Sequence, residues 1–335
     1  LRYWLIRKEA SGLENRISAR QAGAWGFGAM TVPAALTCAG LGWGWVLLGC
    51  AIAAVYFGLT ASLAEGKLEL RELTVRAFGM GFGRVWLILG AAFALFSAAQ
   101  TASQAHLAFP DETGTLAGPA LIVLAALANR KGPEQAARVC GVVSLILAAL
   151  YIIVLLSAAR QVKLEWLRPW GGARQTIEVL PPVLALTCLR FLPGRWERAK
   201  GGWLALLALG PAALAAVTAG CLSPRLTQQL TQPLYTVSQS LSVLDVMERF
   251  EPLVSAALLM GFFALESLLF AACRAQLDAA VPSLGEKKWA GAALGVLAFA
   301  LTFAADGIGP EVWALGAAIF WGIAPLLTQL IVAIK

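Results

Sequence analysis

The sequence predicts an all-α polytopic membrane protein with about ten transmembrane helices. Its composition, its apolar runs and the placement of its basic residues all indicate this fold class. Of the 335 residues, 59% are hydrophobic and 13% are charged, and the charged share is about half of that in soluble domains. Because a lipid bilayer can receive that much apolar surface and water cannot, the composition argues against a soluble enzyme, a disordered chain and a small disulfide scaffold.

Ten apolar runs are candidate membrane spans, because the bilayer core takes about 20 helical residues. In chain order they are residues 20–36, 41–63, 85–106, 116–128, 137–159, 176–192, 203–222, 253–273, 289–305 and 312–334. The fourth and sixth runs are short. Outside the spans, the charged segment 65–83 predicts a short surface helix. Segment 223–251 predicts either an amphipathic helix across the outer mouth or a solvated cap without a ligand role.

Basic residues fall mainly on one side of this bundle. The chain carries 26 Lys and Arg against 19 Asp and Glu, a net charge of +7. With ten spans and both termini cytoplasmic, 19 of the 26 lie in cytoplasmic segments and six in outer loops. Arg190 lies inside the sixth span. Cytoplasmic loops are enriched in Lys and Arg, so topology explains the excess better than nucleic acid does. The loop 160–174 is discordant, because it places basic residues outside.

We therefore expect a cytoplasmic N-terminal segment over residues 1–16, followed by a single bundle over 17–335. Residues 1–16 are polar and basic, so they do not resemble a cleavable signal peptide. The cell membrane is the expected location, with both termini cytoplasmic.

Two spans carry helix-breaking residues at corresponding places. The first has Gly26, Gly28 and Pro33, and the sixth has Pro181 and Pro182. Interrupted helices five spans apart are typical of transporter-type sites, where freed amides and carbonyls bind a solute or an ion. The positions predict two halves, about 17–160 and 174–334, with broken helices 1 and 6. The alternative is that these residues serve only as packing devices and kinks.

The third span carries a polar stripe. Ser97, Thr101 and Gln104 share one helical face, and a polar stripe on an apolar helix must face protein or water. These side chains could contact the polar ends of a ligand, or they could form hydrogen bonds between helices.

Glu266 is the sharper signal, because it lies deep in the eighth span. A carboxylate at that depth costs roughly 2.5–3.5 kcal/mol on insertion scales. It could bind a substrate ammonium group, carry a proton or pair with a basic residue such as Arg190. A purely structural pair, or a protonated Glu266 bonded to a neighbour, is the alternative.

No enzymatic, metal or cofactor site is expected. The six cysteines have no Cys-x-x-Cys spacing, and the single histidine, His106, cannot complete a zinc set. No Ser-His-Asp set or phosphate-binding loop is present, so catalysis is not predicted.

Several segments, in order and spacing, resemble the spore germination permease family, the B subunits of nutrient germinant receptors. Ile17-Ser18-Ala19-Arg20-Gln21 is similar to the start of the family's first span. Leu234-Tyr235 and 244–251 are similar to its outer segment, Gly261-Phe262-Phe263 to its eighth helix, and 109–113 to its third outer turn. The family belongs to the amino acid–polyamine–organocation (APC) superfamily. The compressed sixth span with Arg190 departs from its pattern.

This resemblance implies an APC/LeuT-like fold with two inverted five-helix repeats, located in the bacterial cell membrane or spore inner membrane. It implies a nutrient, usually an amino acid, bound in mid-membrane, and germinant receptor A and C subunits as partners. Together with the break in the sixth helix, it gives the following candidate ligand-binding residues: Gly26, Gly28, Ala29, Thr31, Thr101, Gln104, Pro182 and Glu266. Two other functions remain open. The chain could be an ion-coupled amino acid transporter, or a scaffold or channel-like subunit that binds no nutrient.

Overall fold

The structure is a computed structural model of the whole chain. It describes residues 17–37, 42–63, 69–105, 116–167, 173–194, 202–230, 233–240, 251–285, 289–305 and 309–334. The predicted N-terminal segment 1–16, the family-like turn 109–113 and the amphipathic pattern over 241–250 lie outside the described residues.

Each of the ten predicted spans coincides with a helix or a helix series. They are α2 (Ala19–Thr37), α3 (Trp43–Leu63), α4 (Leu70–Ser103), α5 (Ala117–Ala128), α6 (Pro133–Ala159), α7 (Ala173–Leu184) with η4 (Ala185–Phe191), α8 (Gly202–Leu222), α11 (Glu251–Ala280), α13 (Ala290–Ala305), and α14 (Pro310–Ala317) with η6 (Ala318–Ile323) and α15 (Ala324–Ile334). Four of them, α4, α6, α11 and the last series, are long and apolar enough by themselves to cross a membrane.

Shorter helices connect the spans. They are η3 (Leu164–Leu167), α9 (Pro224–Gln229), α10 (Pro233–Ser240) and α12 (Pro282–Gly285). Lys163 lies with its Nζ 4.4 Å from the centre of the Trp166 ring beside η3. Trp43 at the start of α3 donates a hydrogen bond of 2.7 Å to the carbonyl of Leu167. The loop between α6 and α7 is therefore attached to α3.

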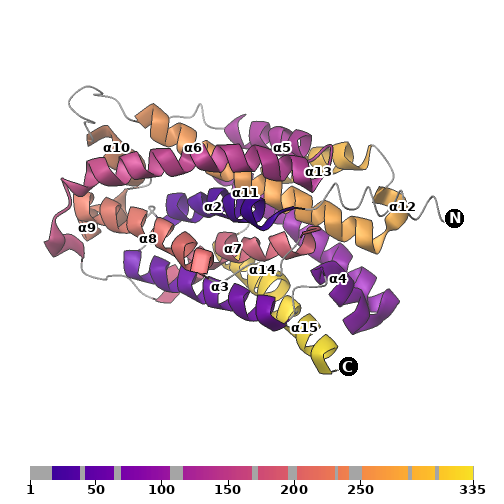
Figure 1. Cartoon of the computed structure of the whole chain (residues 1–335). Coiled ribbons are helices and arrows are strands. Elements are labelled where there is room, and N and C mark those ends of the chain that lie inside the picture. The colour runs from indigo at the N-terminus through magenta and orange to yellow at the C-terminus, as the bar shows by residue number, and fades with distance from the viewer. Residues whose placement is uncertain are drawn as a thin grey trace.

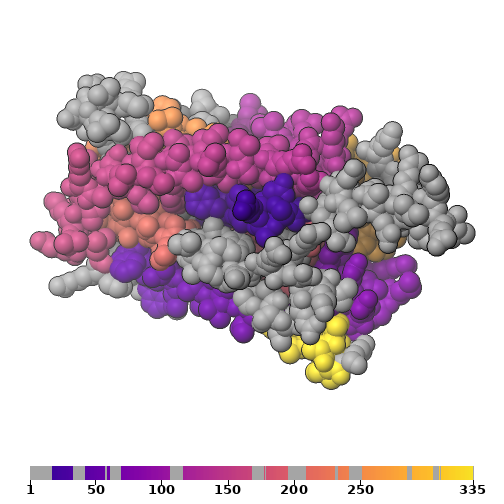
Figure 2. All heavy atoms as spheres, viewed as in Figure 1, coloured from indigo at the N-terminus to yellow at the C-terminus, as the bar shows by residue number. Residues whose placement is uncertain are grey.

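The helices lie side by side with α11 in the centre (Figure 1). It packs against α2, α4, α5, α6 and η4. α6 crosses one whole face of the molecule (Figure 2), and large apolar side chains of α6 and α13 such as Leu145, Leu156 and Phe303 point outward. An apolar outer surface around a bundle is what a bilayer requires.

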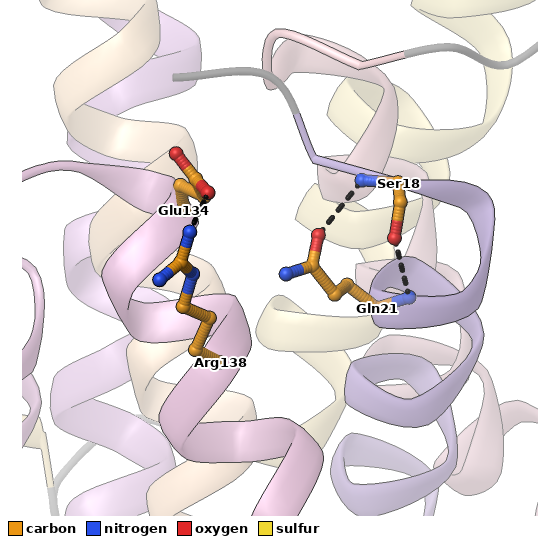
Figure 3. Close-up of polar contacts among 4 residues, drawn as sticks. All are labelled: Ser18, Gln21, Glu134 and Arg138. Atoms are coloured by element: carbon orange, nitrogen blue, oxygen red, sulfur yellow. Dashed lines mark hydrogen bonds and ion pairs between the residues drawn. The ribbon is translucent and has the colours of Figure 1, made fainter. Parts of the chain in front are cut away.

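α2 begins with a reciprocal cap formed by the family-like residues 17–21 (Figure 3). Ser18 N donates to Gln21 Oε1 at 2.9 Å, and Gln21 N donates to Ser18 Oγ at 3.2 Å. This is a capping box, which satisfies amides that the first turn leaves free. Ile17 N also donates to the carbonyl of Pro193, so the start of the first span is joined to the end of the sixth.

The predicted interruption of the first span is wrong. α2 is one α-helix from Ala19 to Thr37 and passes through Gly26, Gly28 and Pro33. The Thr31 hydroxyl donates to the Gly28 carbonyl, and the Ser144 hydroxyl of α6 donates to the Ala24 carbonyl. These hydroxyls bond to helix carbonyls beside the glycines, whereas the carbonyl that Pro33 leaves without its amide donor is that of Ala29.

The sixth span changes helix type instead of opening. Just after Pro181 and Pro182, α7 gives way to the seven-residue 3-10 helix η4. A stretch of that length is uncommon, because the hydrogen bonds of a 3-10 helix have poorer geometry. A second irregularity lies at Gly79, whose φ of 78° kinks α4. The kink separates 70–78 from the third span, at the place of the predicted surface helix.

Candidate ligand-binding site

Close contacts of glycines hold α2 against α6 and α11. A Cβ atom on Gly28 would lie 2.6 Å from Ser144 Oγ and 3.0 Å from the Cβ of Ala264. A Cβ atom on Gly261 would lie 2.6 Å from Thr31 Oγ1. Gly28 and Gly261 therefore act as packing residues, the alternative considered above for Gly28. No open gap separates α2 from α11 at this contact.

A hydrogen bond from a tryptophan side chain also joins α2 to α11. Trp25 is fully buried, and its Nε1 donates a hydrogen bond of 2.9 Å to the carbonyl of Ala264. Gly26 and Ala29 are buried in α2 beside it. These contacts close α2 against α11 at this level.

A small cavity, called here the Thr31 cavity, lies beside this contact between α2 and α11, which is called the seal below. It has a volume of about 20 Å³ and reaches Thr31 between α2, α6, α8, α10 and the start of α11. Tyr151, Leu234 and Leu258 are among its mostly apolar lining residues. A cavity of this size holds about one water molecule, so the structure is a closed arrangement in which an amino acid does not fit at Thr31.

Part of the polar stripe on α4 serves helix packing. Trp313 Nε1 of α14 donates to Ser97 Oγ at 3.1 Å, and the buried Thr101 hydroxyl donates to the Ser97 carbonyl. The hydrogen-bonding alternative is thus correct for Ser97. In contrast, the side-chain oxygens of Gln100 and Gln104 are buried and have no hydrogen-bond partner in the part of the chain that the structure describes.

Glu266 is fully buried in the middle of α11, and among the described residues neither of its carboxylate oxygens has a hydrogen-bond partner. It does not line the Thr31 cavity. The proposed pair with Arg190 is wrong, because no ion pair joins these two residues. A carboxyl group buried without a partner is costly, and the cost falls if a proton, a cation or an ammonium group comes to it.

Gln100 and Glu266 lie at the same depth. A Cβ atom on Gly90 of α4 would overlap the Oε1 of Gln276 on α11, and the start of α4 packs with the end of α11. The two helices are therefore antiparallel, and ten residues along each is about 15 Å. That step leads from Gly90 to Gln100 and from Gln276 to Glu266, so two buried groups with unpartnered oxygens share one level of the bundle.

Arg190 belongs to a separate polar cluster that sequence reasoning missed. It is 3% exposed. In the amide orientation that satisfies both neighbours, Gln329 of α15 accepts from Arg190 Nη1 at 2.7 Å and donates to the Thr60 carbonyl at 2.8 Å. The Tyr56 hydroxyl of α3 donates to the Gly322 carbonyl in the π-helical turn η6. Arg190 thus joins the second, sixth and tenth spans, and it does not extend to the surface.

Besides Glu266, the candidate residues divide into three groups. Gly28 and Thr31 meet α11 at the seal, whereas Gln104 and Thr101 belong to the stripe on α4. Pro182 is buried where α7 ends, next to the change to η4. Their roles toward a ligand stay predictions.

Comparison with known proteins identifies the fold. No family model matches the chain, and no curated protein matches it. Among solved structures, the chain is similar to Mhp1, a nucleobase-cation-symport-1 family transporter in a closed conformation with bromovinylhydantoin bound. The TM-score is 0.64 at 14% identity, covering 94% of this chain and 78% of that one.

A second similar structure is the substrate-bound outward-open state of a Na⁺-coupled sialic acid symporter. Its TM-score is 0.56 at 13% identity, covering 96% of this chain and 73% of the symporter. At such low identity the likeness shows the fold alone. The chain is an all-α polytopic membrane protein with the LeuT-type fold of these transporters.

Proposed function

We propose that the chain is the membrane subunit of a spore nutrient germinant receptor, and that it binds a small nutrient, most simply an amino acid, in mid-membrane. The observation that carries the proposal is Glu266, a fully buried carboxyl group for which the described residues provide no hydrogen-bond partner. The rise of the two helices puts it at about the level of Gln100. An ammonium group would supply both the missing donors and the opposite charge. The resemblance of 17–21 and 234–263 to germination permeases supports the receptor role.

Signalling would follow from the closed arrangement. Glu266 is fully buried and the Thr31 cavity has a volume of only about 20 Å³, so nutrient binding would require a second, more open arrangement of the helices. A nutrient that binds only that arrangement shifts the equilibrium toward it, and the A and C subunits would respond to the shift. No enzymatic step is proposed.

Germination of spores that carry Glu266→Gln tests the proposal. The variant keeps the volume of the side chain and removes the charge, so we expect normal protein levels and a nutrient response lost or weakened at least tenfold. Glu72→Gln, at an exposed position in the first turn of α4, is the matched control and should respond as the wild type does. An unchanged response of the Glu266→Gln spores would remove Glu266 from the mechanism.

A second candidate function is ion-coupled amino acid transport. It is favoured by the fold, since the two similar structures described above are cation-coupled transporters. Uptake of labelled amino acids into proteoliposomes separates the two functions. Accumulation that depends on a sodium or proton gradient would favour the transporter, whereas saturable binding without accumulation would favour the receptor.

A further inference from the structure

Two adjoining hollows lie at the end of the bundle where α5 and α11 finish. The first is a cavity of about 300 Å³, whose lining is mostly polar and basic. Its charged and amide lining residues are Arg71, Asn129, Arg130, Lys131, Arg274 and Asp278. The second is a larger hollow of about 660 Å³ between α5, α11 and α13, with a mostly apolar lining. Arg130 and Arg274 line both, so a charged space opens directly onto an apolar one.

The positive charge of the first hollow is only partly compensated. Arg71 is paired with Glu69, and Arg274 lies 3.9 Å from the Asp278 carboxylate. Arg274 also donates to the Asn129 carbonyl at 3.1 Å. Arg130 and Lys131, in the turn between α5 and α6, are exposed, and no ion pair to either is found among the described residues. An anion can therefore approach two free cations and the guanidinium of Arg274.

The second hollow owes its depth to small residues of α13. Gly291 and Gly295 line it, and a Cβ atom on Gly291 would lie 3.8 Å from Arg274 Nη1. Val123 and Leu127 of α5 and Phe299 of α13 form its exposed apolar walls. The hollow is thus a groove that runs along two membrane-spanning helices and ends at the guanidinium of Arg274.

We propose that this pair of hollows binds one anionic phospholipid. The phosphate would lie among Arg130, Lys131 and Arg274, and one acyl chain would lie in the groove between α5 and α13. Charge complementarity argues for an anionic headgroup, because basic pockets between transmembrane helices on the cytoplasmic side bind such headgroups. The apolar groove argues for a lipid and against a soluble anion, because a soluble anion gains nothing from it.

The turn that carries Arg130 and Lys131 is on the side that the distribution of basic residues predicts to be cytoplasmic. A lipid of the inner leaflet would therefore reach the site directly from the bilayer. Neither Glu266 nor any lining residue of the Thr31 cavity lines these two hollows. A bound lipid would link α5, α11 and α13, and α11 is the helix that carries Glu266.

Native mass spectrometry of the purified full chain tests this proposal. The protein is supplied with equal amounts of phosphatidylglycerol and phosphatidylcholine, and the lipid that stays bound is identified. We expect one preferentially retained phosphatidylglycerol. In Arg130→Gln/Lys131→Gln its affinity should fall roughly thirtyfold, since each basic residue near an anionic headgroup contributes about a factor of five.

Arg76→Gln/Arg84→Gln is the matched control, because it removes the same charge from exposed positions of α4 that do not line either hollow. It should retain phosphatidylglycerol as the wild type does. Val296→Trp fills the groove without a change of charge and should also weaken retention. Equal retention of both lipids by the wild type, or full phosphatidylglycerol retention by either Arg130→Gln/Lys131→Gln or Val296→Trp, would overturn the proposal.

Discussion

Single glycines decide how closely the spans of this bundle approach each other. Gly28 admits Ser144 and Ala264 to the backbone of α2, and Gly118 at the start of α5 lies against the carbonyl of Ala102. Gly141, in the middle of α6, has nothing within 4 Å of the place where a Cβ atom would be. The same residue type is therefore required at some positions and replaceable at others.

This difference predicts opposite effects of one substitution. In Gly118→Ala the new methyl group would overlap the Ala102 carbonyl oxygen, which belongs to the backbone and cannot turn away. Overpacking of that kind costs about 1–3 kcal/mol, so the melting temperature of the purified protein should fall. Gly141→Ala should leave it unchanged or raise it, because alanine is the better helix former by up to about 1 kcal/mol. A Gly118→Ala protein as stable as the wild type would contradict the α4–α5 contact.

Sequence reasoning at this scale found Glu266 but not its surroundings. An isolated charge in an apolar run is visible in the sequence, because its cost in a membrane does not depend on the fold. The partner of Arg190 was not visible, because Gln329 lies 139 positions further along the chain. The role of a glycine is ambiguous in the sequence for the same reason. Gly28 could interrupt its helix or allow close packing against another helix, and only the neighbouring helix decides which.

At the scale of elements, the sixth span is the least regular part of the bundle. Its 3-10 segment η4 is wholly buried, and Arg190 within it is held by Gln329 of α15. A buried guanidinium needs its acceptors. The attachment of η4 to α15 therefore depends on this contact, which also extends to α3 through the Thr60 carbonyl.

A double-mutant cycle measures that dependence. Gln329→Leu leaves Arg190 buried with one acceptor fewer, and it should lower the free energy of unfolding by about 2 kcal/mol. Arg190→Met/Gln329→Leu removes donor and acceptor together and should recover at least half of the loss. Arg190→Met is the second single variant of the cycle, and all variants are measured by denaturation in detergent. If the loss in the double variant equals the sum of the losses in the two single variants, Arg190 and Gln329 do not interact.

The spans themselves could be predicted from the sequence, because a run of about 20 apolar residues rarely forms anything other than a membrane-spanning helix. All ten predicted runs coincide with helices, including the short runs 116–128 and 176–192. Helix type was less predictable. Pro33 lies in a continuous helix, whereas Pro181 and Pro182 precede a 3-10 segment, and the π-helical turn at 318–323 carries no proline. These outcomes depend on which neighbours satisfy the backbone.

For the whole molecule, the account rests on a closed bundle that must open. The Thr31 cavity holds about one water molecule, and Trp25 and Gly28 pack α2 against α11 next to it. Glu266 is fully buried in the middle of α11, and the described residues provide no hydrogen-bond partner for its carboxyl group. A nutrient that binds there must bind an open arrangement, and it stabilises the folded protein by mass action.

Thermal unfolding of the purified chain in a panel of amino acids tests this claim most directly. At 100 times its dissociation constant, a bound nutrient should stabilise the wild type by about 2.7 kcal/mol. Glu266→Gln should fold normally, because it removes an unpartnered buried acid, and it should lose the nutrient-dependent rise in melting temperature. No rise with any amino acid in the wild type, or an equal rise in Glu266→Gln, would contradict the account.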